Sequence, residues 1–563
     1  NTTASNNTAL GHGAMAANTT GAFNTAVGSG ALDANTTADS NVAIGYVALG
    51  VNTTGASNVA VGVGALDANT TASNNTGVGY AALGSNTTGT QNTAVGRSAL
   101  AAVTTGNYNT AVGYVAGDAI TTGSSNTAIG RATLSENQTG NNNTAIGYKA
   151  LDQTTASDNT ALGTQALEAN TTGARNIAIG VSALDSATAQ SDNMAIGYNV
   201  LQAVTGGNTS QGYKNIGIGN YALSSLNSST NGDSIDNVAI GYEAMNSATT
   251  AYRNVAVGYR ALQLNQTQNN TCAVGWYSLR ESVSGGGNTG LGHYTATRTT
   301  SGADNTAVGK SALQYNTSGD SNTAVGSNAL DQHTTGDQNS ALGRRALRYN
   351  TTGGNNVGVG DNAGYLNTTG SNNTYIGVEA GSYSTAVTTG TRNTFVGNHT
   401  ISAANNANDQ NVFGNNITGI AASFTFGTGG SDTTCSNGGT TWSNPSDIRM
   451  KEDIVTATAG LSFINDLRPV TFKWKKEKDI PTTLNGYIKD SDKRYNAETT
   501  QHGFIAQEVK TAIDAHSELK DGFDMWREDA KDGRQRVGQT ALIPMLVKAI
   551  QELSVEVNAL KAA

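Results

Sequence analysis

The fold is decided by a repeat that two neighbouring stretches carry almost unchanged, NTAVGSGALDANTTADS at residues 24–40 and NVAIGYVALGVNTTGAS at residues 41–57. Both are nearly ideal copies of the pattern N-x-A-[VI]-G-x-x-A-L-x-x-N-T-T-G-x-x, from which the first departs only at Ala38. The first five residues of the pattern return about every seventeen positions. There are 23 such starts from Asn7 to Asn393, if Thr271 stands in for one asparagine. Self-similarity at a period of this size is the signature of a solenoid or array. The sequence therefore predicts that most of the chain is a rod.

Each repeat predicts a minimal strand followed by a turn. In NVAVG at residues 58–62, Val59 and Val61 would share one face of a strand and Ala60 the other. Gly62 is expected to end the strand, at positive φ or where another backbone comes close. The Asn-Thr-Thr stretch at residues 69–71 is typical of a turn, because Asn bonds readily to nearby backbone.

The apolar residues of the repeat predict its packing. We expect each unit to bury one Val or Ile and one Leu, such as Val27 and Leu32, with both side chains pointing inward. A unit this small cannot bury them alone, so neighbouring units must stack. One coil per repeat at a spacing of roughly 4.8 Å gives a shaft of ~110 Å. Ala and Gly at most inward positions leave a thin interior, which favours several chains packed around one axis.

Composition and scattered residues exclude several kinds of function. The net charge of -9 gives no support for nucleic-acid binding, and no run of 18 apolar residues could cross a membrane. We expect no metal or cofactor, because the two Cys and six His form no ligand cluster. The chain begins at Asn1, so we expect either a removed segment or a longer protein before it. The Cys and His residues are Cys272, Cys435, His12, His293, His333, His399, His502 and His516.

A change of composition predicts a boundary near residue 445. All four prolines follow residue 444, and residues 446–563 hold 18 of the 32 basic and 19 of the 41 acidic residues. We therefore predict three parts: a repetitive shaft at residues 1–404, a transition segment at 405–445, and a C-terminal domain at 446–563.

The C-terminal domain carries the most specific motifs. They are SDIRMKEDI at residues 446–454, GLSFINDLRPVTFKW at 460–474, HGFIAQEV at 502–509 and LIPMLVKAIQEL at 542–553. Their order and spacing resemble the endosialidase-type intramolecular chaperone domain, the self-cleaving peptidase at the end of phage tail spikes and fibres.

That resemblance implies a catalytic pair, Ser446 and Lys451, and self-cleavage between Pro445 and Ser446. The chemistry is coherent, because a Ser hydroxyl is a weak nucleophile until a base takes its proton. A lysine can act as that base where burial favours its neutral form.

The end of the chain predicts a helix with an apolar seam. Six residues spaced 3, 4, 3, 4, 3 follow the a/d pattern of a coiled coil. Ile or Val at a with Leu at d favours two strands in an isolated coil. The family resemblance implies three, and we predict a trimer seam made by Ile543, Leu546, Ile550, Leu553, Val557 and Leu560.

The repeat itself resembles those of long phage tail fibres and the N-x-x-A-I-G head repeats of trimeric autotransporter adhesins. We therefore predict a mostly β protein: a repetitive trimeric β-solenoid or β-roll shaft, then a small α+β chaperone domain that ends in a coiled-coil helix. Tyrosines that recur after the motif Gly predict a packing or surface ladder, with a sugar-binding strip as the alternative. They include Tyr46, Tyr80, Tyr114, Tyr148, Tyr198 and Tyr242.

The predicted function is that of a structural tail-fibre protein of a tailed phage, located in the virion and used for attachment to the host. Its expected partners are two further copies of itself, a glycan or protein receptor on the host surface, and an upstream virion or fibre protein. A trimeric cell-surface adhesin with a retained trimerisation domain is the alternative. No activity on external substrates is expected, because no non-repetitive stretch is large enough to host such an enzyme. Self-cleavage would be a single-turnover reaction.

Overall fold

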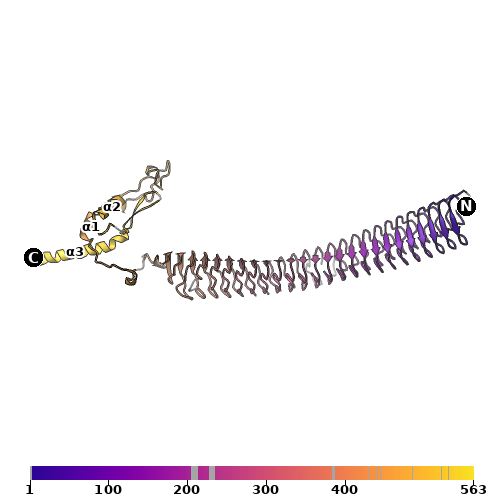
Figure 1. Cartoon of the computed structure of the whole chain (residues 1–563), viewed down its shortest axis with the longest axis horizontal. Helices are drawn as coiled ribbons and strands as arrows, with labels where there is room; N and C mark the ends of the chain where they lie inside the picture. The colour runs from indigo at the N-terminus through magenta and orange to yellow at the C-terminus, as the bar shows by residue number, and fades with distance from the viewer. Residues whose placement is uncertain are drawn as a thin grey trace. The chain divides into compact units, whose positions relative to one another are not determined.

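The computed structural model describes residues 3–203, 213–226, 235–382, 387–429, 431–440, 442–443, 446–484, 486–520, 523–530 and 532–563. The chain divides into two compact units, Asn1–Pro445 and Ser446–Ala563. Taken by itself, the first unit is a long, curved stack of similar coils that begins at the N-terminus (Figure 1).

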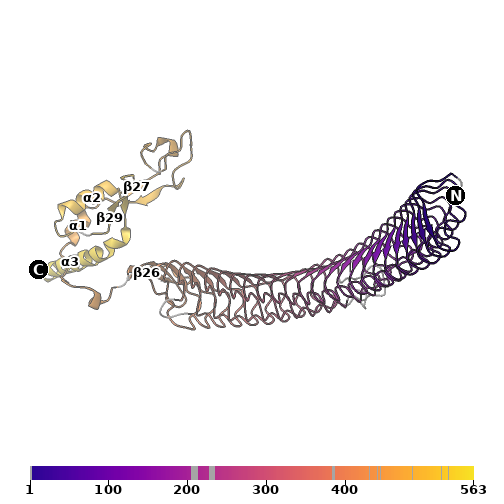
Figure 2. The same ribbon diagram turned by 45° about the vertical axis from the view of Figure 1, so that its right-hand side comes forward.

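One three-residue strand directly follows each motif Asn or its Thr271 substitute, and each strand pairs in parallel with the strand of the next coil. Thr25, Ala26 and Val27 lie opposite Val42, Ala43 and Ile44. The strands therefore align along one side of the shaft (Figure 2), which confirms the predicted β-solenoid. They are β1 (Thr8–Leu10), β2 (Thr25–Val27), β3 (Val42–Ile44), β4 (Val59–Val61), β5 (Thr76–Val78), β6 (Thr93–Val95), β7 (Thr110–Val112), β8 (Thr127–Ile129), β9 (Thr144–Ile146), β10 (Thr160–Leu162), β11 (Ile177–Ile179), β12 (Met194–Ile196), β13 (Ile216–Ile218), β14 (Val238–Ile240), β15 (Val255–Val257), β16 (Cys272–Val274), β17 (Thr289–Leu291), β18 (Thr306–Val308), β19 (Thr323–Val325), β20 (Ser340–Leu342), β21 (Val357–Val359), β22 (Thr374–Ile376) and β23 (Thr394–Val396).

The inward face of the strand is the opposite of the one predicted. Leu32 is fully buried, as expected, but the buried strand residue is Ala26, and Val27 remains partly exposed. The prediction that the Val or Ile points inward was therefore wrong. The reason is space: at Gly77, which takes the place of Ala26 in its own coil, an added Cβ would already lie 3.4 Å from the Leu66 Cγ. A larger side chain at the strand centre has no room beside the Leu.

The motif asparagines form a buried ladder through the coils. The Asn24 Oδ1 accepts the backbone N–H of Asn41 (2.9 Å), and the Asn41 Oδ1 accepts that of Asn58 (2.9 Å). The Asn41 Nδ2 donates to the carbonyl of Gly55 (3.0 Å). Thr271 takes the place of one Asn, and its backbone N–H donates to the Asn254 Oδ1 (2.9 Å), but its hydroxyl donates to the carbonyl of Asn269 (3.3 Å). Each of these Asn side chains thus satisfies backbone groups that would otherwise be buried without partners.

A second buried ladder is made by the Asn of each Asn-Thr-Thr stretch. The Asn52 Nδ2 donates to the Gly55 carbonyl three residues on (2.9 Å), which is the local contact expected of a turn, and also to the Asn35 Oδ1 of the previous coil (3.2 Å). Beside it the Thr36 hydroxyl donates to the Thr53 carbonyl (3.1 Å). The turn is therefore hydrogen-bonded to the turns of the neighbouring coils and not only to water.

Two positions in each coil need unusual backbone. Gly62 ends its strand at φ +137°, and an added Cβ would lie 2.4 Å from the carbonyl oxygen of Gly79 in the next coil. Both expected reasons for that glycine are thus confirmed. Leu66 adopts φ +53°, a left-handed conformation that costs an L-residue roughly 1–2 kcal/mol. The fully buried Leu side chain, stacked between its neighbours in a continuous core, offsets that strain.

Ring size and glycine compensate each other near the end of the array. Tyr375 and Phe395 occupy strand centres in β22 and β23, where their buried rings stack with centroids 5.8 Å apart. Gly364 and Gly381 stand where other coils have the buried Leu. A Cβ at either glycine would lie 2.5 Å from the Tyr375 ring. A large side chain at the strand centre therefore fits here only because Gly replaces the buried Leu.

The segment at 405–445 extends the sheet of the shaft. The strand β24 (Asn411–Asn415) pairs in parallel with β23, and β25 (Ser423–Thr428) pairs in parallel with β24. The last strand, β26 (Ser431–Ser436), runs antiparallel to β25 and so closes the stack with a hairpin.

The second unit is small and mixed. Its helices are α1 (Leu461–Asp466), α2 (Ala506–Ala515) and α3 (Leu542–Ala562), with three-residue 3-10 turns at Ile448–Met450, Glu477–Asp479 and Gln539–Ala541. Two antiparallel pairs join β27 (Val470–Phe472) to β28 (Gln501–Gly503) and β29 (Trp526–Glu528) to β30 (Gln535–Val537). Phe463, Val509, Ile513, Met525 and Leu542 are central to its core. In the described ranges, the helices lack the length and apolar character needed to cross a bilayer.

We predict that Gly62→Ala destabilises the shaft far more than Gly64→Ala. The added Cβ at Gly62 meets backbone, whereas at Gly64 (φ +65°) it meets nothing within 4 Å. We expect roughly 2–5 kcal/mol of lost unfolding free energy for Gly62→Ala, from strain and overpacking together, and about 1–2 for the control. Thermal unfolding followed by circular dichroism, with hydrogen exchange of the neighbouring coils, measures both. Equal losses would mean that the close approach is not what requires this glycine.

One coil replaces the second ladder's Asn with His333, which is fully buried. Its ring nitrogens face two carbonyl oxygens, Nδ1 at 3.2 Å from Asn350 and Nε2 at 2.6 Å from Gly336. A neutral imidazole can donate to only one of them. Burial nevertheless lowers the pKa of His333, although both carbonyls and the nearby Asp337 oppose that shift.

The second prediction is an acid-sensitive coil at His333. Because folding lowers its pKa, the unfolded chain binds a proton that the folded chain resists, so stability falls as pH drops below the unfolded value of about 6.5. His333→Asn restores the ladder and should remove that part of the loss. Hydrogen exchange of the coils around residue 333, compared at about pH 7 and about pH 5 in both proteins, tests this. A wild-type coil whose protection is unchanged or rises at the lower pH would contradict the prediction.

Candidate functional site

The two predicted catalytic side chains are in contact. The Lys451 Nζ donates to the Ser446 Oγ at 2.6 Å. A 3-10 turn at Ile448–Met450 lies between them and folds the chain back on itself. Asp447 caps that turn by accepting the backbone N–H of Arg449 (2.9 Å). The Arg449 guanidinium and this N–H lower the pKa of Asp447, so the cap stays charged.

The surroundings of this pair are open and include exposed apolar side chains among charged ones. Ser446 and Lys451 are both exposed, and so are Ile448 (72%), Met450 (66%) and Val455 (85%). Pro445, the other side of the predicted cleavage bond, lies outside the described residues. The contact fits a nucleophile beside its base, but Lys451 is exposed, so the burial expected to activate this lysine is not present. Catalysis by the pair and cleavage at Pro445–Ser446 stay predictions.

Sequence reasoning missed the exposed apolar side chains beside the pair. The motif itself indicated their exposure. Its apolar residues lie among charged ones, without the regular spacing of a buried strand or helix face; they are Ile448, Met450, Ile454 and Val455. Large apolar groups that are this exposed are typical of interaction surfaces.

The predicted trimer seam lies on one exposed face of α3. The other face packs on the domain through Leu542, Met545 and Ala549, and Glu552 fixes the helix to α1 by accepting the N–H of Leu461 (2.7 Å). That hydrogen bond lowers the pKa of Glu552. The seam residues are exposed by 59, 42, 66, 48, 38 and 78% at Ile543, Leu546, Ile550, Leu553, Val557 and Leu560. The helix therefore presents an unpaired apolar row to solvent.

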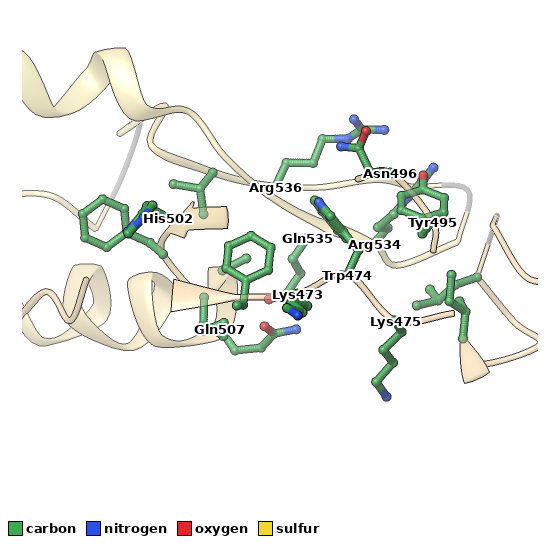
Figure 3. A pocket seen from close by; sticks show the side chains of 18 of the residues that line it. Lys473, Trp474, Lys475, Tyr495, Asn496, His502, Gln507, Arg534, Gln535 and Arg536 are labelled. Carbon is green, nitrogen blue, oxygen red and sulfur yellow. The ribbon is translucent and has the colours of Figure 1, made fainter. Parts of the chain in front are cut away.

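An open pocket of about 980 Å³ lies elsewhere in the same unit, beside β27, β28 and β30 (Figure 3). Trp474 and Tyr495 line it, with ring centroids 5.5 Å apart, and the Arg534 Nη1 donates to the Tyr495 hydroxyl (2.9 Å). Lys473 and Lys475 add positive charge. Its lining does not include the Ser446–Lys451 pair.

The recurring tyrosines form a surface ladder, as predicted. Tyr46 and Tyr80 are more than half exposed, and Arg97 lies over the ring of Tyr80 with its Cζ 5.6 Å from the centroid. The rings gather most densely near β15 and β16, where Tyr259 and Trp276 stack with centroids 4.4 Å apart.

Comparison with known families matches residues 446–517 to the peptidase family whose model is described as the chaperone of endosialidase. The match begins at Ser446 and includes Lys451. Searches of the curated proteins and of the solved structures return no match. The long β-solenoid and this C-terminal chaperone domain together support a tail-fibre-like protein. In the described residues, no group of three or more Cys, His, Asp or Glu is placed to hold a metal ion.

Proposed function

We propose that the chain is a structural tail-fibre protein of a tailed phage that forms parallel homotrimers and serves in attachment to the host surface. The observation that carries this is the exposed seam on α3, in a C-terminal unit whose residues 446–517 match the endosialidase chaperone and which follows a long repetitive shaft in the chain. Six exposed apolar residues at a/d spacing on a helix anchored by its other face favour association between copies.

The chaperone role follows from the repeat. Nearly identical coils can pair one or more units out of step and still keep most of their contacts. A non-repetitive domain that trimerises first would set the three chains in register before the shafts assemble. The seam on the last helix covers under three heptads, too short to be stable alone, so the whole domain must take part.

The remaining parts of the proposal concern place and partners. The protein would reside in the virion, joined to an upstream virion or fibre protein, and would bind a glycan or protein receptor on the host. A trimeric adhesin on a cell surface has the same architecture and is the second candidate. A virion-attachment domain in the same protein would favour the fibre, and a membrane anchor would favour the adhesin.

We predict that Ile550→Lys disrupts the trimer and that Val555→Lys does not. The two side chains are similarly exposed on α3 (66 and 69%), but only Ile550 lies on the seam. Three lysines brought together at one a position repel and must lose water, whereas Val555 faces away from the seam. Light scattering at micromolar concentration should give a trimer mass for wild type and Val555→Lys, and a loss of trimer for Ile550→Lys. A monomer mass for the wild-type protein would contradict the proposal itself.

Self-cleavage is the proposed second activity of the domain. Lys451 would take the proton of the Ser446 hydroxyl as its Oγ attacks the carbonyl carbon of Pro445. The peptide C–N bond breaks, the Ser446 nitrogen receives a proton, and an ester joins Pro445 to the Oγ. Water then hydrolyses the ester, which leaves a carboxylate on Pro445 and a free amine and hydroxyl on Ser446. The reaction would occur once per chain and make assembly hard to reverse.

The cleavage prediction is a fragment of 118 residues, Ser446–Ala563, from the wild-type chain. Ser446→Ala should leave only full-length protein because the nucleophile is gone, and Lys451→Ala should do nearly the same because no base remains. A denaturing gel with N-terminal sequencing measures this, and light scattering should find both variants still trimeric. The same fragment from wild type and Ser446→Ala would show that an outside protease cuts the chain.

A further inference from the structure

The outward strand residues of the shaft carry a pattern that a single chain does not explain. We call the third residue of each strand from β1 to β23 the aliphatic stripe; Val27, Ile44 and Val61 are examples. It is Val, Ile or Leu in all 23 strands, yet it is never buried: 11 of these residues are at least 37% exposed, and the other 12 are partly exposed.

Charge is missing from this whole face. The first strand residue, which points outward beside the stripe, is Thr, Val, Ile, Met, Cys or Ser, so neither outward row contains a charged residue. Two positions beyond the stripe the same coils carry charge freely, as at Arg97, Arg131 and Asp361. The uncharged face is therefore a property of these two rows and not of the shaft surface in general.

The core of one chain cannot account for the stripe. The space inside each coil is filled by Leu, by two asparagines and by the small strand centre, and the stripe lies outside that core. A polar residue would serve as well there if the face met water. At roughly 4.8 Å per coil the stripe runs for about 105 Å, far more than the scattered apolar residues of an ordinary surface.

We propose that the aliphatic stripe is the face by which the shafts of the homotrimer pack against one another, in register and around a common axis. This rests on the proposed trimer and assigns its shaft interface. The occupant is a second copy because the stripe repeats at the coil spacing over 23 coils, and another shaft of this chain offers the same period and length. Parallel order follows from α3, whose seam joins equivalent ends.

Packing of this kind completes the burial that each thin coil lacks. Stripe side chains from three copies meet near the axis, with uncharged Thr and Val rows at their edges. Apolar area removed from water there adds to the small core of each coil. The interface would resemble a domain core, as is typical of permanent assemblies.

A matched pair of variants in one coil tests the stripe in the full chain. Ile179 belongs to it, while Val181, two residues on, is an exposed aliphatic residue (44%) outside it. Ile179→Glu should lower the thermal midpoint of the shaft and increase its hydrogen exchange around β11, because three carboxylates would meet at the axis. Val181→Glu should leave both near wild type. Equal effects of the two substitutions would overturn the assignment.

The native thiol of Cys272 can be used to test whether the stripes of different chains lie close together. Cys272 lies in the outward row beside the stripe and is partly exposed, whereas Cys435 is buried. In a Cys435→Ser background a short thiol cross-linker should join Cys272 across chains. The control variant carries Cys272→Ser, Cys435→Ser and Thr267→Cys, so that its one thiol lies on an exposed turn close to the same coil. In this variant the cross-linker should not join the chains.

The outcomes separate this assignment from the trimer. A trimer mass with links at Thr267→Cys but none at Cys272 would place the turns at the axis and overturn the stripe. A trimer whose Cys272 reacts fully with a bulky maleimide would show that the face is open, or covered by another partner in the virion, and would also overturn it. A monomer mass would remove the proposed trimer and the assignment together.

Discussion

The structure of the shaft depends on an interior that is too narrow for a large side chain at the strand centre. Leu fills one side and two buried asparagine ladders fill the rest, so only Ala or Gly fits beside them in almost every coil. The ladders are strong because equivalent asparagines recur at the coil spacing, each bonding the backbone of the next coil, as in the stacked amides of cross-β assemblies. The strained left-handed Leu and the bare Gly are consequences of closing so small a coil.

The same constraint decides what the outside must do. A strand of three residues has one inward position, and that position has been given to a small residue. The two outward positions then hold the larger β-branched side chains, which favour extended backbone but bury little in a single chain. The residues that favour the strand therefore lie on its outer face, while the residue that is buried within the coil lies on its inner face. Because the outer face is apolar, it is suited to association between chains in the proposed assembly.

Much of this could be predicted, and the failures in the shaft have one cause. The period placed the strands, the Gly ends and the buried Leu, and the a/d spacing found a helix whose seam faces solvent. Alternation alone could not say which face is inward, because Val59-Ala60-Val61 alternates equally well either way, and only the packed coil shows that the centre must be small. The buried asparagines were missed because Asn is read as a turn residue, and its ladder exists only once coils stack. The Ser446–Lys451 contact was accessible because the family motif fixes their spacing, whereas the exposed apolar groups around it have no periodic signal.

Repetition explains why two such different units belong on one chain. Each coil is specified by contacts to identical neighbours, so the shaft is robust in its local geometry but carries little information about which coil of one chain should meet which coil of another. The few irregular coils, such as those with Tyr375 and His333, are exceptions inside the stack and present no matched surface of their own. In the proposed trimer, register between chains must then come from sequence that occurs once, and the C-terminal domain is the largest such part. Its helix would need only a short seam for this task, because it would have to align three ends and not to hold three shafts together.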